Sequence, residues 1–157
     1  MTTSELLRGM LERAYNRRSW HGTNLRGAIR TVTLSQAVWR PAPARHNIWE
    51  LVVHAAYWKY AARRRLTGET RGSFALKGSN WFVRPEDMTA RAWKADVALL
   101  DQMHRALLDA VATAPLAAWD RRRPGVKDTD LELVAGVAAH DLYHAGQIQM
   151  LKKLARR

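Results

Sequence analysis

Cysteine is absent from this 157-residue sequence. A chain without cysteine has no disulfide framework, no cysteine-ligated zinc site and no thiol nucleophile of its own. Any metal ion bound by its side chains would therefore be held by His, Asp or Glu.

Long apolar runs are absent as well. No stretch approaches the roughly 18 apolar residues that a membrane-spanning helix needs. The N-terminal residues 1–5, MTTSE, lack the basic and apolar segments of a secretory signal. We therefore expect a cytoplasmic protein without membrane contact. Apolar residues make up 47% of the chain, which suffices for a core. The length predicts one domain over residues 1–157, since domains typically take about 100–200 residues.

Acidic residues are few relative to basic ones. The 26 Lys and Arg against 14 Asp and Glu give a formal net charge of +12. Such a charge produces salt-sensitive attraction to nucleic acid or anionic lipid. The basic residues form scattered runs, which indicates a solvated surface. Specific nucleic-acid binding is therefore not expected, although it stays open as the least favoured alternative. The runs include Arg17-Arg18, Arg63–Arg65, Arg121–Arg123 and Lys152-Lys153.

Strand patterns are also lacking, whereas apolar residues recur at helical spacing in four regions. The first covers Leu6–Ala14 and resumes at Leu25–Val32, as one kinked helix or two pieces. The others centre on Leu51–Ala62, Trp93–Val111 and Leu133–Leu151. The expected fold class is all-α, a four-helix bundle.

The second helix is expected to begin at Asn47, where Glu50 three residues later resembles a capping box, and to end at Thr67-Gly68. Residues 69–88 contain Gly72, Gly78 and Pro85 and show no periodicity. They predict a long crossover between the second and third helices. A connection of that length often carries function.

The remaining boundaries follow from caps and prolines. The third helix is expected from near Thr89 to about Ala112, where Pro115 follows. The fourth opens at 128–130, where Asp and Thr are good caps, and continues to the last residues. Short helical turns are expected at 33–39 and 116–120.

Histidine residues carry the strongest chemical signal. His140 and His144 are spaced i and i+4 on a helix, so their Cβ atoms lie about 5–6 Å apart on one face and the rings can converge on one metal ion. A buried imidazole nitrogen without a partner costs roughly 1–3 kcal/mol, and a metal supplies such a partner. His54 also lies on an apolar helix face. A weak internal repeat relates Leu34–Trp39, before the His54 helix, to Leu116–Trp119, before the His140 helix, and would place His54 opposite the pair. Three neutral imidazoles leave coordination positions open, as catalytic metal sites do.

Other interpretations of the histidines stay open. The H-x-x-x-H pattern is frequent by chance, and buried rings can be satisfied by carbonyl groups or water. His104 also lies on an apolar stripe, where a core or supporting role is favoured over a fourth ligand. His21 and His46 stand at helix starts and are expected at the surface or in caps.

Further polar residues near these histidines are candidates for catalysis. Glu50, one turn before His54, could act as an acceptor or general base, although its capping role already accounts for it. Gln147 could orient a substrate or a metal-bound water, or serve as a buried amide. Asp141 and Tyr143 flank the ligands but point away and are not expected to be catalytic. Four aromatic residues could line a pocket mouth or serve in packing: Trp49, Tyr57, Trp58 and Trp81.

Two segments, His46–Trp58 and Ala139–Ile148, resemble the signature regions of the DinB superfamily. Trp20-His21-Gly22 and Trp39–Pro43 are similar to further parts of the pattern. The resemblance spans nearly the whole chain in order. Its most specific element is the H-x-x-x-H-x-G-Q-I run at residues 140–148.

The resemblance implies a four-helix bundle with a divalent metal ion, zinc or nickel most often, on three histidines that correspond to His54, His140 and His144. It implies kinship with YfiT-like metal-dependent hydrolases and with bacillithiol, mycothiol and glutathione S-transferases, and it favours a homodimer. Because the chain has no thiol, a transferase reaction would take a low-molecular-weight thiol as cosubstrate. The predicted function is a metal-dependent thiol S-transferase or hydrolase acting on a small molecule. A noncatalytic bundle, in which the metal stabilises the fold or an oligomer, is the main alternative.

Overall fold

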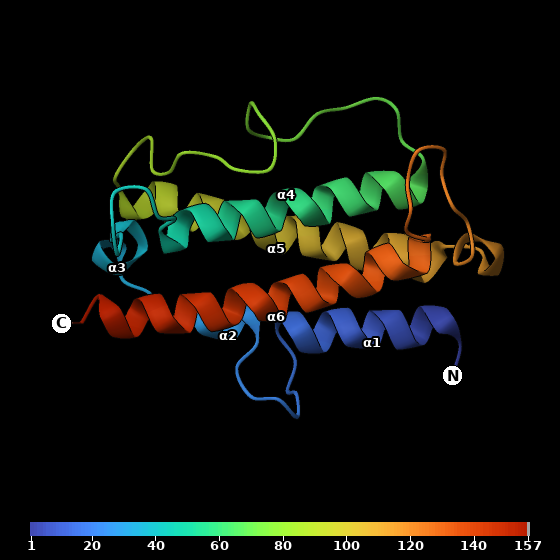
Figure 1. Cartoon of the computed structure of the whole chain (residues 1–157), viewed down its shortest axis with the longest axis horizontal. Coiled ribbons are helices and arrows are strands. Elements are labelled where there is room, and N and C mark those ends of the chain that lie inside the picture. Colours follow the sequence, from blue (N-terminus) through green and yellow to red (C-terminus); the bar gives the residue numbers. More distant parts are fainter. Residues whose placement is uncertain (157) are drawn as a thin grey trace.

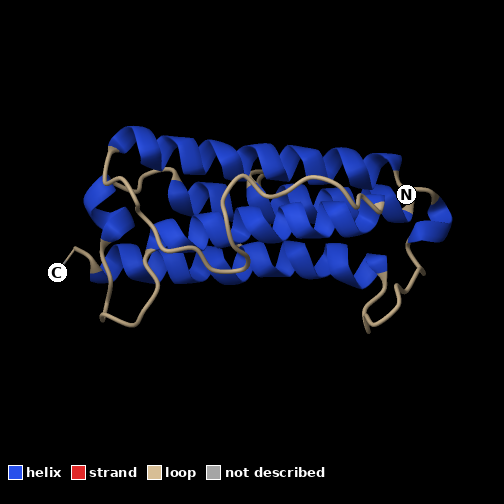
Figure 2. Cartoon of the chain, turned by 90° about the horizontal axis from the view of Figure 1, so that it is seen from above, coloured by secondary structure: helices blue, strands red, loops and turns tan. Residues whose placement is uncertain are grey.

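The computed structural model describes residues 1–156, and this part of the chain forms helices and no strand (Figures 1 and 2). The predicted all-α four-helix bundle is confirmed. Four helices are long, and the 24-residue α5 and 25-residue α6 are the longest. The elements are α1 (Thr3–Tyr15), α2 (Leu25–Ile29), α3 (Leu34–Val38), α4 (Ile48–Thr67), α5 (Ala90–Thr113), the 3-10 helix η1 (Leu116–Ala118) and α6 (Asp130–Leu154).

The four long helices pack around a common centre. Contacts join α4 to α5 and α6, and α1 to α5 and α6. Helix α2 extends the row begun by α1 and also packs on α6 (Figure 1). The segment 68–89 runs back along the bundle, so α4 and α5 point the same way while α6 runs opposite to both (Figure 1). The crossover between the second and third long helices is therefore confirmed, and it brings α4 and α6 side by side.

Helix ends are set by side-chain caps. Thr2, Thr33 and Thr129 form capping boxes at the starts of α1, α3 and α6. Thr89 caps α5, as the sequence predicts. At the end of α4, Gly68 adopts φ 74°, a left-handed conformation that glycine tolerates best.

The capping box predicted at the start of α4 is only half formed. The Asn47 side chain accepts a hydrogen bond of 2.8 Å from the backbone N–H of Glu50. The Glu50 carboxylate does not return it and instead accepts two hydrogen bonds from the Arg40 guanidinium. A bidentate, charge-assisted pair is stronger than a bond to a neutral backbone N–H, so Arg40 captures the carboxylate.

The N-terminal region is two helices. Asn24 caps α2, and its side-chain amide donates to the backbone oxygen of Arg17 at 2.8 Å. These bonds hold the intervening loop in a non-helical path, because an Asn side chain bonded to nearby backbone competes with helix. The predicted short turns are the helices α3 and η1.

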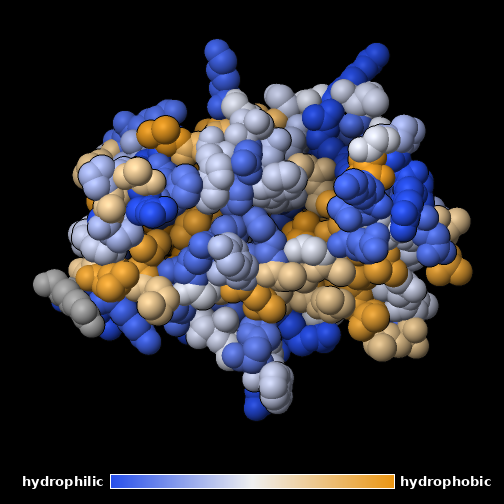
Figure 3. Space-filling view, in the orientation of Figure 1, coloured by the Kyte–Doolittle hydropathy of each residue, from blue (hydrophilic) through white to orange (hydrophobic). Residues whose placement is uncertain are grey.

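Two clusters of buried apolar residues form the core, one toward each end of the bundle. Between α4 and α6 lies a buried ion pair, in which Lys59 Nζ donates to Asp141 Oδ2 and both side chains are 0% exposed. Asp141 thus points toward Lys59, in agreement with its exclusion from the catalytic candidates. Unlike this pair, most charged residues lie at the surface, and Figure 3 shows hydrophilic residues spread widely over one face.

None of the helices in residues 1–156 combines the length and the apolar content that crossing a bilayer requires.

Candidate metal centre

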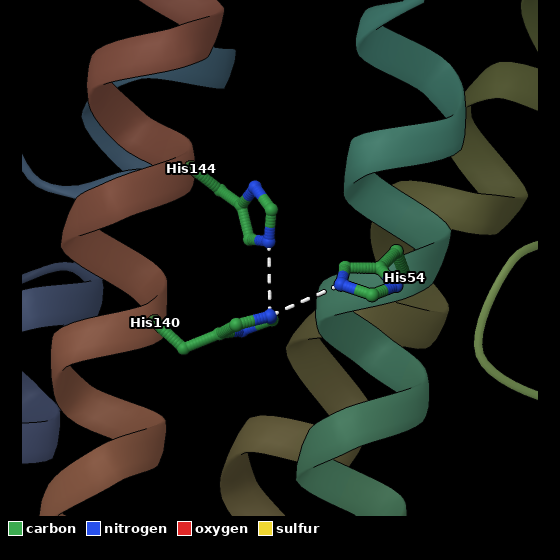
Figure 4. Close-up of side chains that lie close together, drawn as sticks. All are labelled: His54, His140 and His144. Atoms are coloured by element: carbon green, nitrogen blue, oxygen red, sulfur yellow. Dashed lines mark hydrogen bonds between the residues drawn. The ribbon is translucent and has the colours of Figure 1, made fainter. Parts of the chain in front are cut away.

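The three predicted histidines meet between α4 and α6 (Figure 4). The Nε2 atom of His140 lies 3.0 Å from Nε2 of His54 and 2.9 Å from Nε2 of His144. One candidate ligand atom from each residue lies within 4.8 Å of the other two. The i, i+4 spacing on α6 places two rings one turn apart, nearly perpendicular to each other, and the antiparallel α4 supplies the third ring from the opposite side.

Hydrogen bonds at the far side of two rings fix their tautomers. The Nδ1 atom of His54 lies 2.8 Å from the backbone oxygen of Asn80, and Nδ1 of His144 lies 2.6 Å from Oε1 of Gln147. Because carbonyl oxygens only accept, both Nδ1 atoms carry the proton and both Nε2 atoms turn a lone pair toward the centre. His140 Nε2 has at most one proton to share between them. A cation at the centre would satisfy all three nitrogens.

Burial keeps the three imidazoles neutral. It lowers the pKa of His54 below its ordinary value. It also lowers the pKa of His140 to about 3 and that of His144 to about 4, with smaller contributions from the neighbouring imidazoles. At neutral pH the rings therefore offer lone pairs and not N–H⁺ groups.

The donor set fits a divalent transition metal. Three imidazoles suit zinc or nickel, and zinc–nitrogen distances of about 2.0–2.1 Å in a tetrahedral site correspond to nitrogens about 3.3 Å apart. The observed separations of 2.9 and 3.0 Å are a few tenths of an ångström shorter. His54 and His144 have the supporting acceptor that metal-bound histidines usually have. Within residues 1–156, the buried Nδ1 of His140 has no such partner.

The crossover between α4 and α5 covers the His54 side of the cluster. The Trp81 ring stacks on His54 at 3.8 Å between centroids and on His46 at 3.6 Å. Trp58 on α4 donates from Nε1 to the Asn80 side-chain oxygen at 2.9 Å, which fixes the crossover next to the site. Asn80 has φ 62°, a left-handed conformation that Asn adopts more readily than most residues.

Glu50, one turn before His54 on α4, forms an ion pair with Arg40. Its carboxylate accepts hydrogen bonds from Arg40 and pairs with His46 Nδ1 at 2.9 Å. Burial alone would raise the pKa of Glu50, but the hydrogen bonds from Arg40 and His46 hold it below its ordinary value. Both carboxylate oxygens of Glu50 already have hydrogen-bond partners. Its role as acceptor or general base stays a prediction.

The other singled-out residues lie apart from the cluster. His104 is a core residue that stacks on Tyr15 at 3.8 Å, and His21 is exposed. Trp49 is fully buried and donates from Nε1 to Asp96 at 2.6 Å, so it packs the core and lines no pocket mouth. Sequence reasoning missed Asn80 as a partner of the cluster, because residues 69–88 carry no periodicity. It also missed the stacking role of His46.

The fold and the site together define a helical-bundle protein with a three-histidine cluster between two antiparallel helices. The sequence model of the DinB superfamily matches residues 10–148, a span that includes all three histidines. The chain belongs to the DinB superfamily, which confirms the resemblance. Comparison with curated proteins and with solved structures gave no match.

Proposed function

We propose that the protein is a divalent-metal-dependent enzyme in which His54, His140 and His144 hold the ion. The observation that carries the proposal is the convergence of three neutral Nε2 atoms, two of them with fixed lone pairs. Superfamily membership supports it. A metal ion on three imidazoles supplies a Lewis acid with open positions, which can lower the pKa of a bound water or thiol.

The surrounding residues would position the reaction. Asn80 and Gln147 hold the rings of His54 and His144 through their Nδ1 protons. Trp81 shields the His54 face from water by stacking on it. Gln147 also lies where its amide could orient a substrate, and Glu50 could take up a proton if the pair with Arg40 opened. Gln147 and Glu50 are proposed catalytic residues on this basis.

The reaction class is a thiol S-transfer or a hydrolysis. A transferase would use a low-molecular-weight thiol as cosubstrate, because the chain has no cysteine. Zinc and nickel are the proposed metals. Turnover distinguishes the two classes: a thiol with monochlorobimane reports transfer, and a p-nitrophenyl ester reports hydrolysis. Metal-dependent activity in neither assay, with full metal occupancy, would favour the noncatalytic bundle.

The ligand assignment is tested by His144→Ala. Removing one of three ligands should lower zinc affinity by at least a hundredfold, because the remaining two imidazoles form an incomplete site. The measurement is elemental analysis and calorimetric zinc titration of protein purified without chelator or nickel resin. The control is His21→Ala, which removes an exposed histidine outside the cluster. Retained stoichiometric zinc in His144→Ala would refute the assignment.

The remaining expectations stay predictions. These are a homodimer, a small-molecule substrate and a cytoplasmic location. The mass in solution by sedimentation decides the first.

A further inference from the structure

A groove lies beside the histidine cluster, and His144 is one of the residues that line it. Its volume is about 810 Å³, within the range of about 300–1,000 Å³ that small-molecule sites occupy. His144 and Gln147 contribute to its wall, so the groove adjoins the proposed metal site. Twelve residues line it, among them Arg45, Trp81, Tyr143, Gly146, Met150 and Leu151.

Apolar side chains form most of this wall, and several are exposed. Tyr143 is 65% exposed and Met150 59% exposed, on the outer face of α6. Trp81 closes the opposite side, held in place by its stacking on His46 and His54. Apolar surface is visible in Figure 3 in the left half of the view, where α6 runs below the crossover. Exposed apolar surface next to a polar site marks a place where an apolar group binds.

The charge of the groove is positive. Arg45 lines it, and the lining residues include no Asp or Glu. Within residues 1–156 no acidic side chain lies within ion-pair distance of Arg45, whereas the nearby Arg40 is paired with Glu50. An anionic group in the groove would therefore find a guanidinium that is not already engaged by a carboxylate.

We propose that this groove binds the substrate that reacts at the histidine cluster, and that the substrate has an apolar body and one anionic group such as a carboxylate. The apolar body lies against Trp81, Met150 and Leu151, and the anion pairs with Arg45. The inference rests on the proposed function, because it is the neighbouring metal site that makes the bound molecule a substrate.

A second copy of the chain is the competing occupant, and the dimensions disfavour it. A stable protein interface takes about 20–30 residues from each partner, whereas twelve line this groove. The groove is also concave and has a proposed metal ligand in its wall, which suits a small molecule more than a protein surface.

Two glycines of α6 allow a matched test. A Cβ atom at Gly146 would meet no atom within 4 Å, and the same holds at Gly136, ten residues earlier. Both positions are exposed and helical, but only Gly146 lines the groove. Gly146→Trp should fill the groove without disturbing the core, and Gly136→Trp is the control for adding the same side chain to the same helix.

The probe is 8-anilinonaphthalene-1-sulfonate, an aromatic molecule with one anionic group, titrated by its fluorescence into zinc-loaded and metal-free protein. We expect Gly146→Trp to weaken its binding at least tenfold and Gly136→Trp to leave it unchanged. Met150→Glu, a second groove variant, should also weaken it by placing an anion there. Arg45→Gln should weaken it about fivefold, as for an exposed charge pair. The uncharged probe N-phenyl-1-naphthylamine should not respond to Arg45→Gln.

Equal probe binding by wild type, Gly146→Trp and Met150→Glu would overturn the inference, whatever the zinc content. A loss of dimer mass in Gly146→Trp but not in Gly136→Trp would also overturn it, by assigning the groove to a second copy. Failure of the proposed function gives a different result: no zinc bound to the wild type, with probe binding and its response to Gly146→Trp intact.

Discussion

His104 shows how one buried side chain shapes the response to pH. Its ring stacks on Tyr15, and neither ring nitrogen has a partner within residues 1–156. Burial lowers the pKa of His104 from 6.5 to about 2, with smaller contributions from Lys59 and Arg105. Between pH 6.5 and about 2, His104 therefore binds a proton in the unfolded chain but not in the folded chain. The contribution of neutral His104 to the free energy of unfolding is therefore fully present above pH 6.5. It is lost as the pH falls toward 2, so the protein becomes less stable in acid.

We expect His104→Phe to make the protein less sensitive to acid. Phe fills a similar space and has no nitrogen to desolvate, so the variant should be more stable by about 1–3 kcal/mol at pH 5. Urea unfolding at pH 7.5 and pH 5 measures the effect as a difference from wild type. The cluster histidines also have lowered pKa values, but they are present in both proteins, so the difference between variant and wild type reports His104 alone. A variant that loses as much stability between the two pH values as the wild type would contradict this account.

The three cluster histidines and the nearby Gln147 were predictable from the sequence, whereas the partner of His54 was not. Helical spacing alone places His140 and His144 together, and the apolar face of α4 suggests His54. Asn80, by contrast, reaches His54 from a loop whose path depends on tertiary contacts such as the Trp58 hydrogen bond. Glu50 was assigned a local role, because Arg40 is not visible as its partner in a pattern of adjacent residues.

At the scale of the helices, the buried ion pair of Lys59 and Asp141 joins α4 to α6 at positions close in sequence to the cluster histidines. Lys59 lies five residues after His54, and Asp141 follows His140 in the chain. Both side chains are fully buried, so each charge depends on the other. The pair therefore restricts how α4 and α6, the two helices that carry the three histidines, pack against each other.

Asp141→Asn should destabilise the protein by about 3–5 kcal/mol, because it leaves the Lys59 ammonium buried without a countercharge. The double variant Lys59→Met with Asp141→Leu removes both charges and should lose much less. Denaturant unfolding of Lys59→Met, Asp141→Leu and the double variant gives the coupling free energy. If the double variant lost as much as the sum of the singles, the pair would not be coupled and this account would be wrong.

The helix boundaries were largely predictable, because caps and breakers are local. Thr89, Thr129 and Gly68 mark ends that the sequence indicates. The two pieces of the N-terminal region were undecidable from apolar spacing, since the Asn24 contact to Arg17 bridges a loop. The course of residues 69–88 over the bundle was not predictable either, because it depends on contacts between residues far apart in the sequence, such as Trp58 and Asn80.

At the scale of the whole molecule, the bundle topology explains why the site lies where it does. The crossover makes α4 and α5 parallel and leaves α6 antiparallel to α4, so a ring on α4 faces a pair on α6 (Figures 1 and 4). The net charge of +12 comes from basic runs scattered along the chain. Specific nucleic-acid binding therefore stays the least favoured alternative, and the single domain over residues 1–157 stays a prediction.

The central claim is that three imidazoles from α4 and α6 bind one divalent ion. X-ray absorption at the zinc edge of the zinc-loaded protein tests it most directly, because imidazole rings give a distinct multiple-scattering pattern. The expected spectrum shows three imidazole nitrogens at about 2.0–2.1 Å and at least one further light-atom ligand. A spectrum with oxygen ligands alone, or with one imidazole at most, would contradict the account.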